Sequence, residues 1–183
     1  MSLEALGTAA AVGTFIVIAA TAIAAIVQLR HLRAQNQLTG LLTVLAQVEA
    51  PEVNDWVDGA RELLQSRLPD PAYRRAILDG TYERKNNPWL YLANYYEWVG
   101  SLVKHKLLPE ESLLDVYSGR IIGAWNILEG IVPLIRRRGG LSVWENFEYL
   151  VVKARNWSAR YAQGTFPKGV PRLQINVTWP ELA

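Results

Sequence analysis

The sequence predicts an all-α protein: a single N-terminal transmembrane helix, then a cytoplasmic helical bundle, then an extended C-terminal tail. First, the segment from Ala5 to Leu29 carries no charged residue. As a helix rising ~1.5 Å per residue it reaches about 37 Å, enough to cross a ~30 Å hydrocarbon core. Second, apolar residues after this segment recur at helical spacing. Third, only one short segment, near the C-terminus, alternates with the period of two that is typical of strands.

Residues 1–29 are expected to remain in the membrane rather than to be cleaved as a signal peptide. A signal peptide begins with basic residues and has an apolar core of ~7–15 residues, whereas this N-terminus carries Glu4 and a longer apolar run. Arg30 and Arg33 follow the span, with His31 beside them, and no Lys or Arg precedes it. The positive-inside rule therefore predicts that the N-terminus faces outward and that the rest of the chain is cytoplasmic.

The span is rich in small residues at a spacing of four. Ala5, Ala9 and Gly13 form one such set, and Ala20 and Ala24 form another. Small residues at this spacing let two helix backbones approach closely, and such packing drives helix association in lipid. We therefore expect the span to dock on a second membrane helix, either another subunit or its own copy. The alternative is a simple anchor that happens to be rich in alanine.

The residues after the span predict a juxtamembrane helix and then a bundle. A helical stripe continues through residues 30–50, and residues 51–162 are expected to form the bundle. Proline suits the first turn of a helix, so successive helices are expected to begin at Pro51, Pro71 and Pro88. The residues before the last two prolines, Asp70 and Asn87, are expected to cap those helices.

Two further helices complete the predicted bundle. The first covers residues 109–138, where Pro133 should introduce a kink. The pair Gly119 and Gly123 within it suits close packing against another helix. The second is expected to begin at residues 142–145, whose Ser-x-x-Glu pattern is typical of a capping box.

Residues 163–183 are expected to form an extended tail, because proline and glycine recur there too often for a helix. Its apolar residues alternate with polar ones, but no second strand is predicted to pair with it. The tail therefore either packs along the bundle through one apolar face or docks on a partner protein. The apolar residues concerned are Leu173, Ile175, Val177 and Trp179.

Several short segments between Tyr91 and Trp157 are similar to a known family. They are the run Asn94 to Gly100, Lys106 to Leu108, Arg120 to Ile122, Trp125, Pro133 with the arginines after it, and Trp144 to Leu150. As a set they resemble the domain of unknown function 4760, an uncharacterised bacterial membrane-anchored helical family. The resemblance implies a membrane helix followed by a helical bundle, and we expect the bacterial inner (cytoplasmic or intracytoplasmic) membrane. It implies no activity, and the tail lies outside it.

The charged residues of the bundle that are candidates for chemistry are Glu97, Arg120, Glu145 and Glu148. One hypothesis is an acid–base or metal site. A di-metal site in a bundle needs Glu-x-x-His pairs, and neither His31 nor His105 lies in such a motif. The alternative, which we favour, is a network of Arg–Glu hydrogen bonds that fixes the register of the helices.

A second set of cations is a candidate for contact with the membrane surface. Basic side chains next to a span are attracted to anionic lipid headgroups. For the arginine triplet, a solvated helix end is the alternative interpretation. The residues expected to contact headgroups are Arg30, Arg33, Arg136, Arg137 and Arg138.

The patterns favour a non-enzymatic protein without a cofactor. The sequence has no P-loop, no glycine-rich dinucleotide turn, no His-Glu-x-x-His and no Gly-x-Ser-x-Gly. It has no cysteine, which excludes disulfides and zinc–thiolate sites. The span contains no histidine that could ligate haem. The formal net charge of +2 is too small to predict nucleic-acid binding.

We therefore expect an accessory subunit that docks on and stabilises an integral membrane complex, either bioenergetic (photosynthetic or respiratory) or transport. Its partners would be the lipid bilayer and other transmembrane subunits or its own copies. The alternative is a membrane-tethered small-ligand sensor or signalling module. An enzyme built on Glu97 and Glu148 is a third hypothesis.

Overall fold

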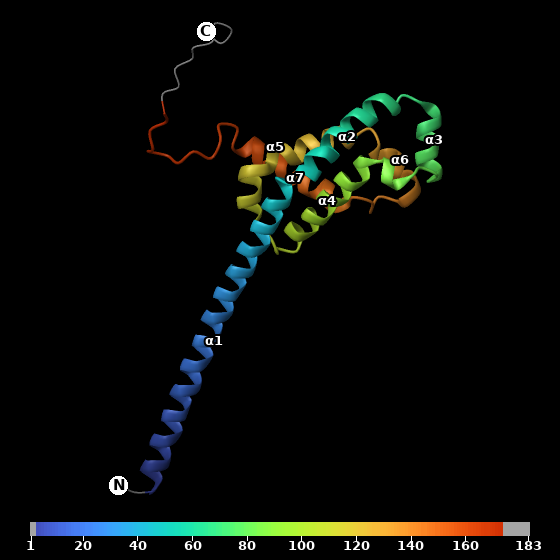
Figure 1. Cartoon of the computed structure of the whole chain (residues 1–183). Coiled ribbons are helices and arrows are strands. Elements are labelled where there is room, and N and C mark those ends of the chain that lie inside the picture. Colours follow the sequence, from blue (N-terminus) through green and yellow to red (C-terminus); the bar gives the residue numbers. More distant parts are fainter. Residues whose placement is uncertain (1–2, 174–183) are drawn as a thin grey trace.

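The computed structural model describes residues 3–173 and shows a helical bundle at one end of a long helix (Figure 1). The helices are α1 (Leu3–Val48), α2 (Pro51–Arg67), α3 (Pro71–Asp79), the 3₁₀ helix η1 (Arg84–Asn86), α4 (Pro88–Lys104), α5 (Glu110–Leu128), α6 (Val132–Gly139) and α7 (Glu145–Arg160). No strand occurs in residues 3–173, so the predicted all-α class is confirmed for this range. Three predicted tail residues, Ile175, Val177 and Trp179, lie outside the described residues.

The first helix, α1, is uninterrupted and joins the predicted span to the predicted juxtamembrane helix. Among the described helices it is the one long and apolar enough to cross a membrane. Its N-terminal part projects away from the bundle (Figure 1), and none of its most apolar window is buried within the chain. Only its last turns enter the bundle, where Val44 and Val48 are buried. The apolar surface before them therefore needs a cover from outside this chain.

The bundle is organised around α4, which packs against both α2 and α7, while α5 packs on α7. Phe147 of α7 is fully buried at the centre of this arrangement. Its ring stacks on Tyr96 of α4 at a centroid distance of 5.0 Å and meets the edge of Trp125 of α5 at 5.1 Å. Aromatic rings bury large apolar areas and prefer such stacked and edge-to-face contacts. Phe147 thus joins α4, α5 and α7.

Several predicted helix ends are confirmed. Pro51, Pro71 and Pro88 each occupy the first turn of a helix. The Asp70 carboxylate accepts a hydrogen bond of 2.8 Å from the backbone N–H of Ala72, so it caps α3 as predicted. Local sequence determines these ends because the capping group and the helix it caps are neighbours in the chain.

The predicted kink at Pro133 is wrong, because the chain breaks there instead. Helix α5 ends at Leu128, and α6 begins at Val132 with Pro133 in its first turn. A proline inside a helix lacks an N–H donor and clashes with the carbonyl four residues before it. Starting a new helix removes both costs, and it lets α6 leave α5 and pack against α3.

Two predicted helix caps are also wrong. Helix α7 begins at Glu145, and its N-cap residue is Trp144 in a left-handed conformation (φ 57°), without a capping side chain. Ser142 therefore does not form the predicted capping box. Asn87 precedes α4 but makes no side-chain cap to it. Its side chain is buried instead, because it serves a polar contact in the core that is described below.

Glycine allows the closest helix contact of the bundle. A Cβ built on Gly100 of α4 would collide with the backbone carbonyl of Asn146 in α7, so the two backbones cross almost in contact there. By contrast, a Cβ on Gly119 or Gly123 of α5 would meet open space. The predicted role of that glycine pair in close packing is therefore wrong within the described chain, and the role belongs to Gly100.

Replacing Gly100 by Ala is expected to lower the free energy of unfolding by ~1–3 kcal/mol, because the α7 backbone must move to admit the methyl group. The same change at Gly123 is the matched control. It is expected to raise stability by ~0.5–1 kcal/mol, since alanine is the better helix former and the site is open. Chemical unfolding of the full chain in detergent, monitored by tryptophan fluorescence, measures the free energy of unfolding of both variants. Equal effects would contradict the close crossing of α4 and α7.

Candidate functional site

A carboxylate from α4 caps the N-terminus of α7. Glu97 accepts a hydrogen bond of 2.8 Å from the backbone N–H of Phe147 and one of 2.7 Å from the side-chain amide of Asn146. The first N–H groups of a helix have no acceptor within it, and the helix dipole favours negative charge there. Glu97 thus supplies from another helix the cap that Ser142 was predicted to supply locally.

Glu145 and Glu148 lie in the first turn of α7 but bind different cations. Glu145 pairs with Lys104 of α4 at 3.2 Å. Glu148 pairs with Arg136 of α6 at 2.8 Å, and the side chain of Arg136 is only 13% exposed. Arg136 also donates a hydrogen bond of 3.0 Å to the carbonyl of Val143. These contacts hold the connection between α6 and α7 against the bundle.

Arg120 of α5 lies elsewhere, at the C-terminal end of α1. Its guanidinium donates to the carbonyl of Val48 at 3.3 Å and pairs with Glu49 at 3.3 Å. The hydroxyl of Tyr117 donates to the same carboxylate at 3.0 Å. A cation at this position satisfies a terminal carbonyl and complements the helix dipole. Arg120 thus fastens the long helix to the bundle.

The four predicted residues therefore do not form one network. Glu97, Glu145 and Glu148 gather at the start of α7 with partners that the sequence did not reveal, and Arg120 contacts none of them. Each carboxylate already has a protein partner, so the arrangement joins helices rather than presenting paired acids to a common cavity. Among the described residues, no group of three or more His, Cys, Asp or Glu side chains could hold a metal ion.

Sequence reasoning missed a buried polar cluster around Asn87, which is 4% exposed. Its side-chain carbonyl accepts hydrogen bonds from the Tyr73 hydroxyl at 2.7 Å and the Trp89 indole N–H at 2.8 Å. Its amide donates to the carbonyl of Glu83 at 2.6 Å. Burial raises the pKa of Tyr73, which keeps its hydroxyl protonated as a donor. The cluster stabilises the turn before α4, and the polar groups of Tyr73, Asn87 and Trp89 bond to one another within it.

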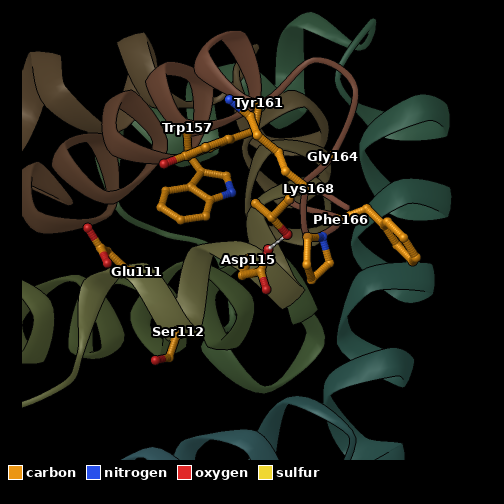
Figure 2. Close-up of a pocket in the computed structure, with 10 residues that line it drawn as sticks. Glu111, Ser112, Asp115, Trp157, Tyr161, Gly164, Phe166 and Lys168 are labelled. Atoms are coloured by element: carbon orange, nitrogen blue, oxygen red, sulfur yellow. Dashed lines mark hydrogen bonds between the residues drawn. The ribbon is translucent and has the colours of Figure 1, made fainter. Parts of the chain in front are cut away.

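A cleft of about 540 Å³ lies between the first turns of α5 and the segment that follows α7 (Figure 2). Glu111 and Asp115 of α5 form one side, and the Trp157 ring lies on the other (Figure 2). Trp157 packs on Tyr161 with ring centroids 4.5 Å apart. The hydroxyl of Thr165 donates to Asp115, so the first part of the predicted tail is attached to the bundle. The cleft therefore combines two carboxylates and the cation Lys168 with an aromatic wall.

The two sets of predicted headgroup-binding arginines lie on different parts of the protein. Arg30 and Arg33 are exposed directly after the apolar part of α1. The Arg136–Arg138 triplet ends α6, which lies at the end of the bundle away from α1 (Figure 1). The triplet therefore lies apart from Arg30 and Arg33, and Arg136 is already paired with Glu148. Its contact with headgroups stays a prediction, as does the alternative of a solvated helix end.

The small residues predicted for helix packing are free of intrachain contacts where their side chains are described. Ala20 and Ala24 are exposed, and a Cβ built on Gly13 would meet nothing within 4 Å. With 3.6 residues per turn, these three and the positions of Ala5 and Ala9 share one face of α1. That face is open to lipid or to a second helix. In the tail, Leu173 is 91% exposed and does not pack on the bundle.

The family model described as domain of unknown function (DUF4760) matches residues 15–155 of the chain, which is well over half of it. The chain belongs to the DUF4760 family. The DUF4760 match begins inside the apolar part of α1 and ends in the last turns of α7. The long helix and the bundle are therefore one family unit, and the tail lies outside it. No curated protein and no solved structure matches the chain.

Replacing Glu97 by Gln in this DUF4760 protein is expected to lower the free energy of unfolding by about 1–2 kcal/mol, because the N–H groups of α7 lose a charged acceptor. Glu145→Gln is the matched control, since it removes only a half-exposed ion pair of the kind worth ~0–1 kcal/mol. Denaturant unfolding of the full chain in detergent gives both values. A Glu145 variant as damaging as the Glu97 variant would argue against the capping role.

Proposed function

We propose that this DUF4760 protein is a non-enzymatic accessory subunit that docks on and stabilises an integral membrane protein complex. The observation that carries the proposal is the apolar part of α1, which projects from the bundle with its side chains uncovered by the chain. A helix of this kind is covered by lipid and, where backbones can approach, by another helix. The partner complex would be bioenergetic, for example photosynthetic or respiratory, or a transporter.

The small-residue face of α1 supports the proposal that α1 packs against another protein in the membrane. Gly13, Ala20 and Ala24 lie along it without an intrachain neighbour to fill the space. In lipid there is no hydrophobic force between helices, so close packing of small residues supplies much of the association energy. The partner would be another transmembrane subunit or a second copy of this chain.

The bundle adds exposed apolar surface outside the membrane helix. Trp98 of α4, Val116 of α5 and Val152 of α7 are 42%, 65% and 51% exposed. Leu173 begins the predicted docking residues of the tail and contacts no helix of the bundle. Apolar residues exposed in this way supply the contacts from which protein interfaces are built. They support docking of the bundle and tail on neighbouring subunits.

We place the protein in the inner (cytoplasmic or intracytoplasmic) membrane of a bacterium, with its N-terminus outside and the bundle in the cytoplasm. Arg30 and Arg33 at the end of the apolar segment support this orientation, since no Lys or Arg precedes them. The bundle would then meet the cytoplasmic surfaces of the complex.

Purification of the tagged full chain from its source membranes in a mild detergent is expected to recover a membrane protein partner. The combined variant Gly13→Leu, Ala20→Leu and Ala24→Leu is expected to reduce that recovery several-fold, because larger side chains keep the two backbones apart. The control carries three leucines on the opposite face, at Ala11, Ala22 and Ala25. Mass spectrometry of the eluates measures the loss. A monomer without a membrane partner, or equal loss in both variants, would contradict docking through this face.

The cleft of Figure 2 favours a second candidate function, a membrane-tethered sensor of a small molecule. Its volume of about 540 Å³ is in the range of ligand pockets. Carboxylates at Glu111 and Asp115 facing the Trp157 ring would suit a small organic cation, which binds both negative charge and aromatic faces. Binding there would connect the start of the tail to α5.

A thermal-shift screen of the full chain against small organic cations tests this candidate. Bound ligand stabilises the folded state by ~2.7 kcal/mol at 100 times its dissociation constant, so a selective compound should raise the melting temperature. Glu111→Gln should reduce that rise, whereas Glu62→Gln, an exposed change on α2, should leave it unchanged. The sensor hypothesis fails if no compound in the screen stabilises the protein.

A further inference from the structure

The turn that follows α4 lies beside α1 just beyond the apolar part of that helix. The side-chain amide of Gln37 donates a hydrogen bond of 3.1 Å to the carbonyl of Lys106. One turn later on α1, a Cβ built on Gly40 would lie 3.5 Å from Leu108 and 3.7 Å from the carbonyl of Leu107. In Figure 1 this end of α4 is directed along α1 toward its N-terminal part. The turn is thus the part of the bundle held closest to the span.

The position of this turn along α1 is close to the outer edge of the lipid headgroup layer. Gln37 follows Leu29 by eight residues and Leu32 by five, which is about 8–12 Å along a helix. The headgroup layer beyond a ~30 Å hydrocarbon core is about 5–8 Å thick in each leaflet. Flexible side chains on the turn therefore reach the polar surface of the leaflet from which α1 emerges.

The surface presented there is both cationic and apolar. Lys106, Arg30 and Arg33 are exposed. Leu107 is 56% exposed, and Leu29 and Leu32 are 65% and 54% exposed. An apolar groove of about 560 Å³ separates this stretch of α1 from the turn.

The nearby acidic residues leave these cations unpaired. Between Ala5 and Val48 the sequence contains no Asp or Glu. Glu110, which follows the turn, is paired with Lys153 at 3.1 Å. The neighbouring cation Lys104 is already used, because it pairs with Glu145 of α7. Lys106, Arg30 and Arg33 thus remain available to an anionic partner.

The backbone of Lys106 adds an independent observation. Lys106 has φ 58°, the left-handed conformation that ends α4, and its N–H and that of Leu107 bond to the carbonyls of Val103 and Leu102. Glycine is the usual residue at this position of a helix end, because it has no Cβ to strain. A lysine here is less favourable for folding than a glycine would be, and no ion pair of its side chain with the described residues offsets that cost.

We propose that the turn Lys104–Leu108, with Arg30 and Arg33 of α1, is a binding surface for anionic phospholipid. Lys106, Arg30 and Arg33 contact headgroup phosphates, while Leu107 packs against the headgroup layer. This contact would hold the bundle against the leaflet and fix its rotation about α1. The inference rests on α1 crossing a membrane, but on no partner protein, and it holds for either orientation of the chain.

The test uses the full chain reconstituted in nanodiscs of phosphatidylcholine, alone or with roughly one third phosphatidylglycerol. Because the chain has no cysteine, Leu107→Cys carries a single fluorophore, and lipids with a headgroup-level quencher report its depth. Strong quenching that increases with phosphatidylglycerol is expected. The control fluorophore replaces Leu141, which is 81% exposed in the connection between α6 and α7, and should not be quenched. Quenching that is weak at position 107, or equal at both positions, would overturn the proposal.

Lys106→Gly separates lipid binding from folding. It should lower the equilibrium constant for contact with the anionic surface by roughly fivefold, the effect of one cation, so that quenching at one third phosphatidylglycerol decreases clearly. It should leave the unfolding midpoint in detergent unchanged or higher, because glycine suits φ 58°. Arg137→Gly at the far end of the bundle is the control for loss of charge. Quenching that does not depend on Lys106 would overturn its role. Since only chain and lipid are present, the result is independent of whether a partner subunit co-purifies.

Discussion

The crossing of α4 and α7 is the contact on which the rest of the bundle depends. Gly100 lets the two backbones approach, and Glu97, one turn earlier on α4, then reaches the first N–H groups of α7. The cap in turn fixes where α7 begins, which sets the side chain of Phe147 among the rings of Tyr96 and Trp125. A shift of α7 by one residue would lose the cap and the ring contacts together, so the crossing has one favourable register.

A second constraint connects this bundle to the long helix α1. Arg120 and Tyr117 of α5 hold the end of α1 through Val48 and Glu49, while Gln37 holds the turn after α4. These contacts lie at two heights on α1, so the bundle does not hang from a flexible linker. A continuous helix fixed at two heights holds the bundle at a defined distance from the apolar part of α1. Both proposed activities, docking on a subunit and binding of anionic lipid, need such a defined placement.

The candidate residues show how far sequence reasoning reaches. Glu97, Arg120, Glu145 and Glu148 were favoured as a single structural network, whereas in the structure they contact separate partners. Their partners could not be predicted, since Asn146, Lys104, Arg136 and Glu49 lie far from them in the chain. The prediction that Asn87 caps α4 was wrong for the same reason. An Asn just before a helix usually caps it, but here the Asn87 side chain bonds to Tyr73, which belongs to another helix. The glycine pair of α5 has the right spacing for packing, but spacing does not say whether a helix lies opposite.

The sequence by itself determined what local chemistry controls. The long run without charged residues from Ala5 to Leu29 predicted the apolar helix. Proline residues and Asp70 predicted several helix starts, and the helical spacing of apolar residues predicted the all-α class. Only the tertiary structure decided that Glu97 of α4 caps the start of α7 and that α5 stops at Leu128. It also decided which cations lie near the apolar part of α1. The physical reason is that a cap, an ion pair or a close backbone approach needs two surfaces, and the second surface comes from a distant part of the chain. For the same reason the triplet Arg136–Arg138, prominent in sequence, lies away from α1, whereas Lys106 lies beside it.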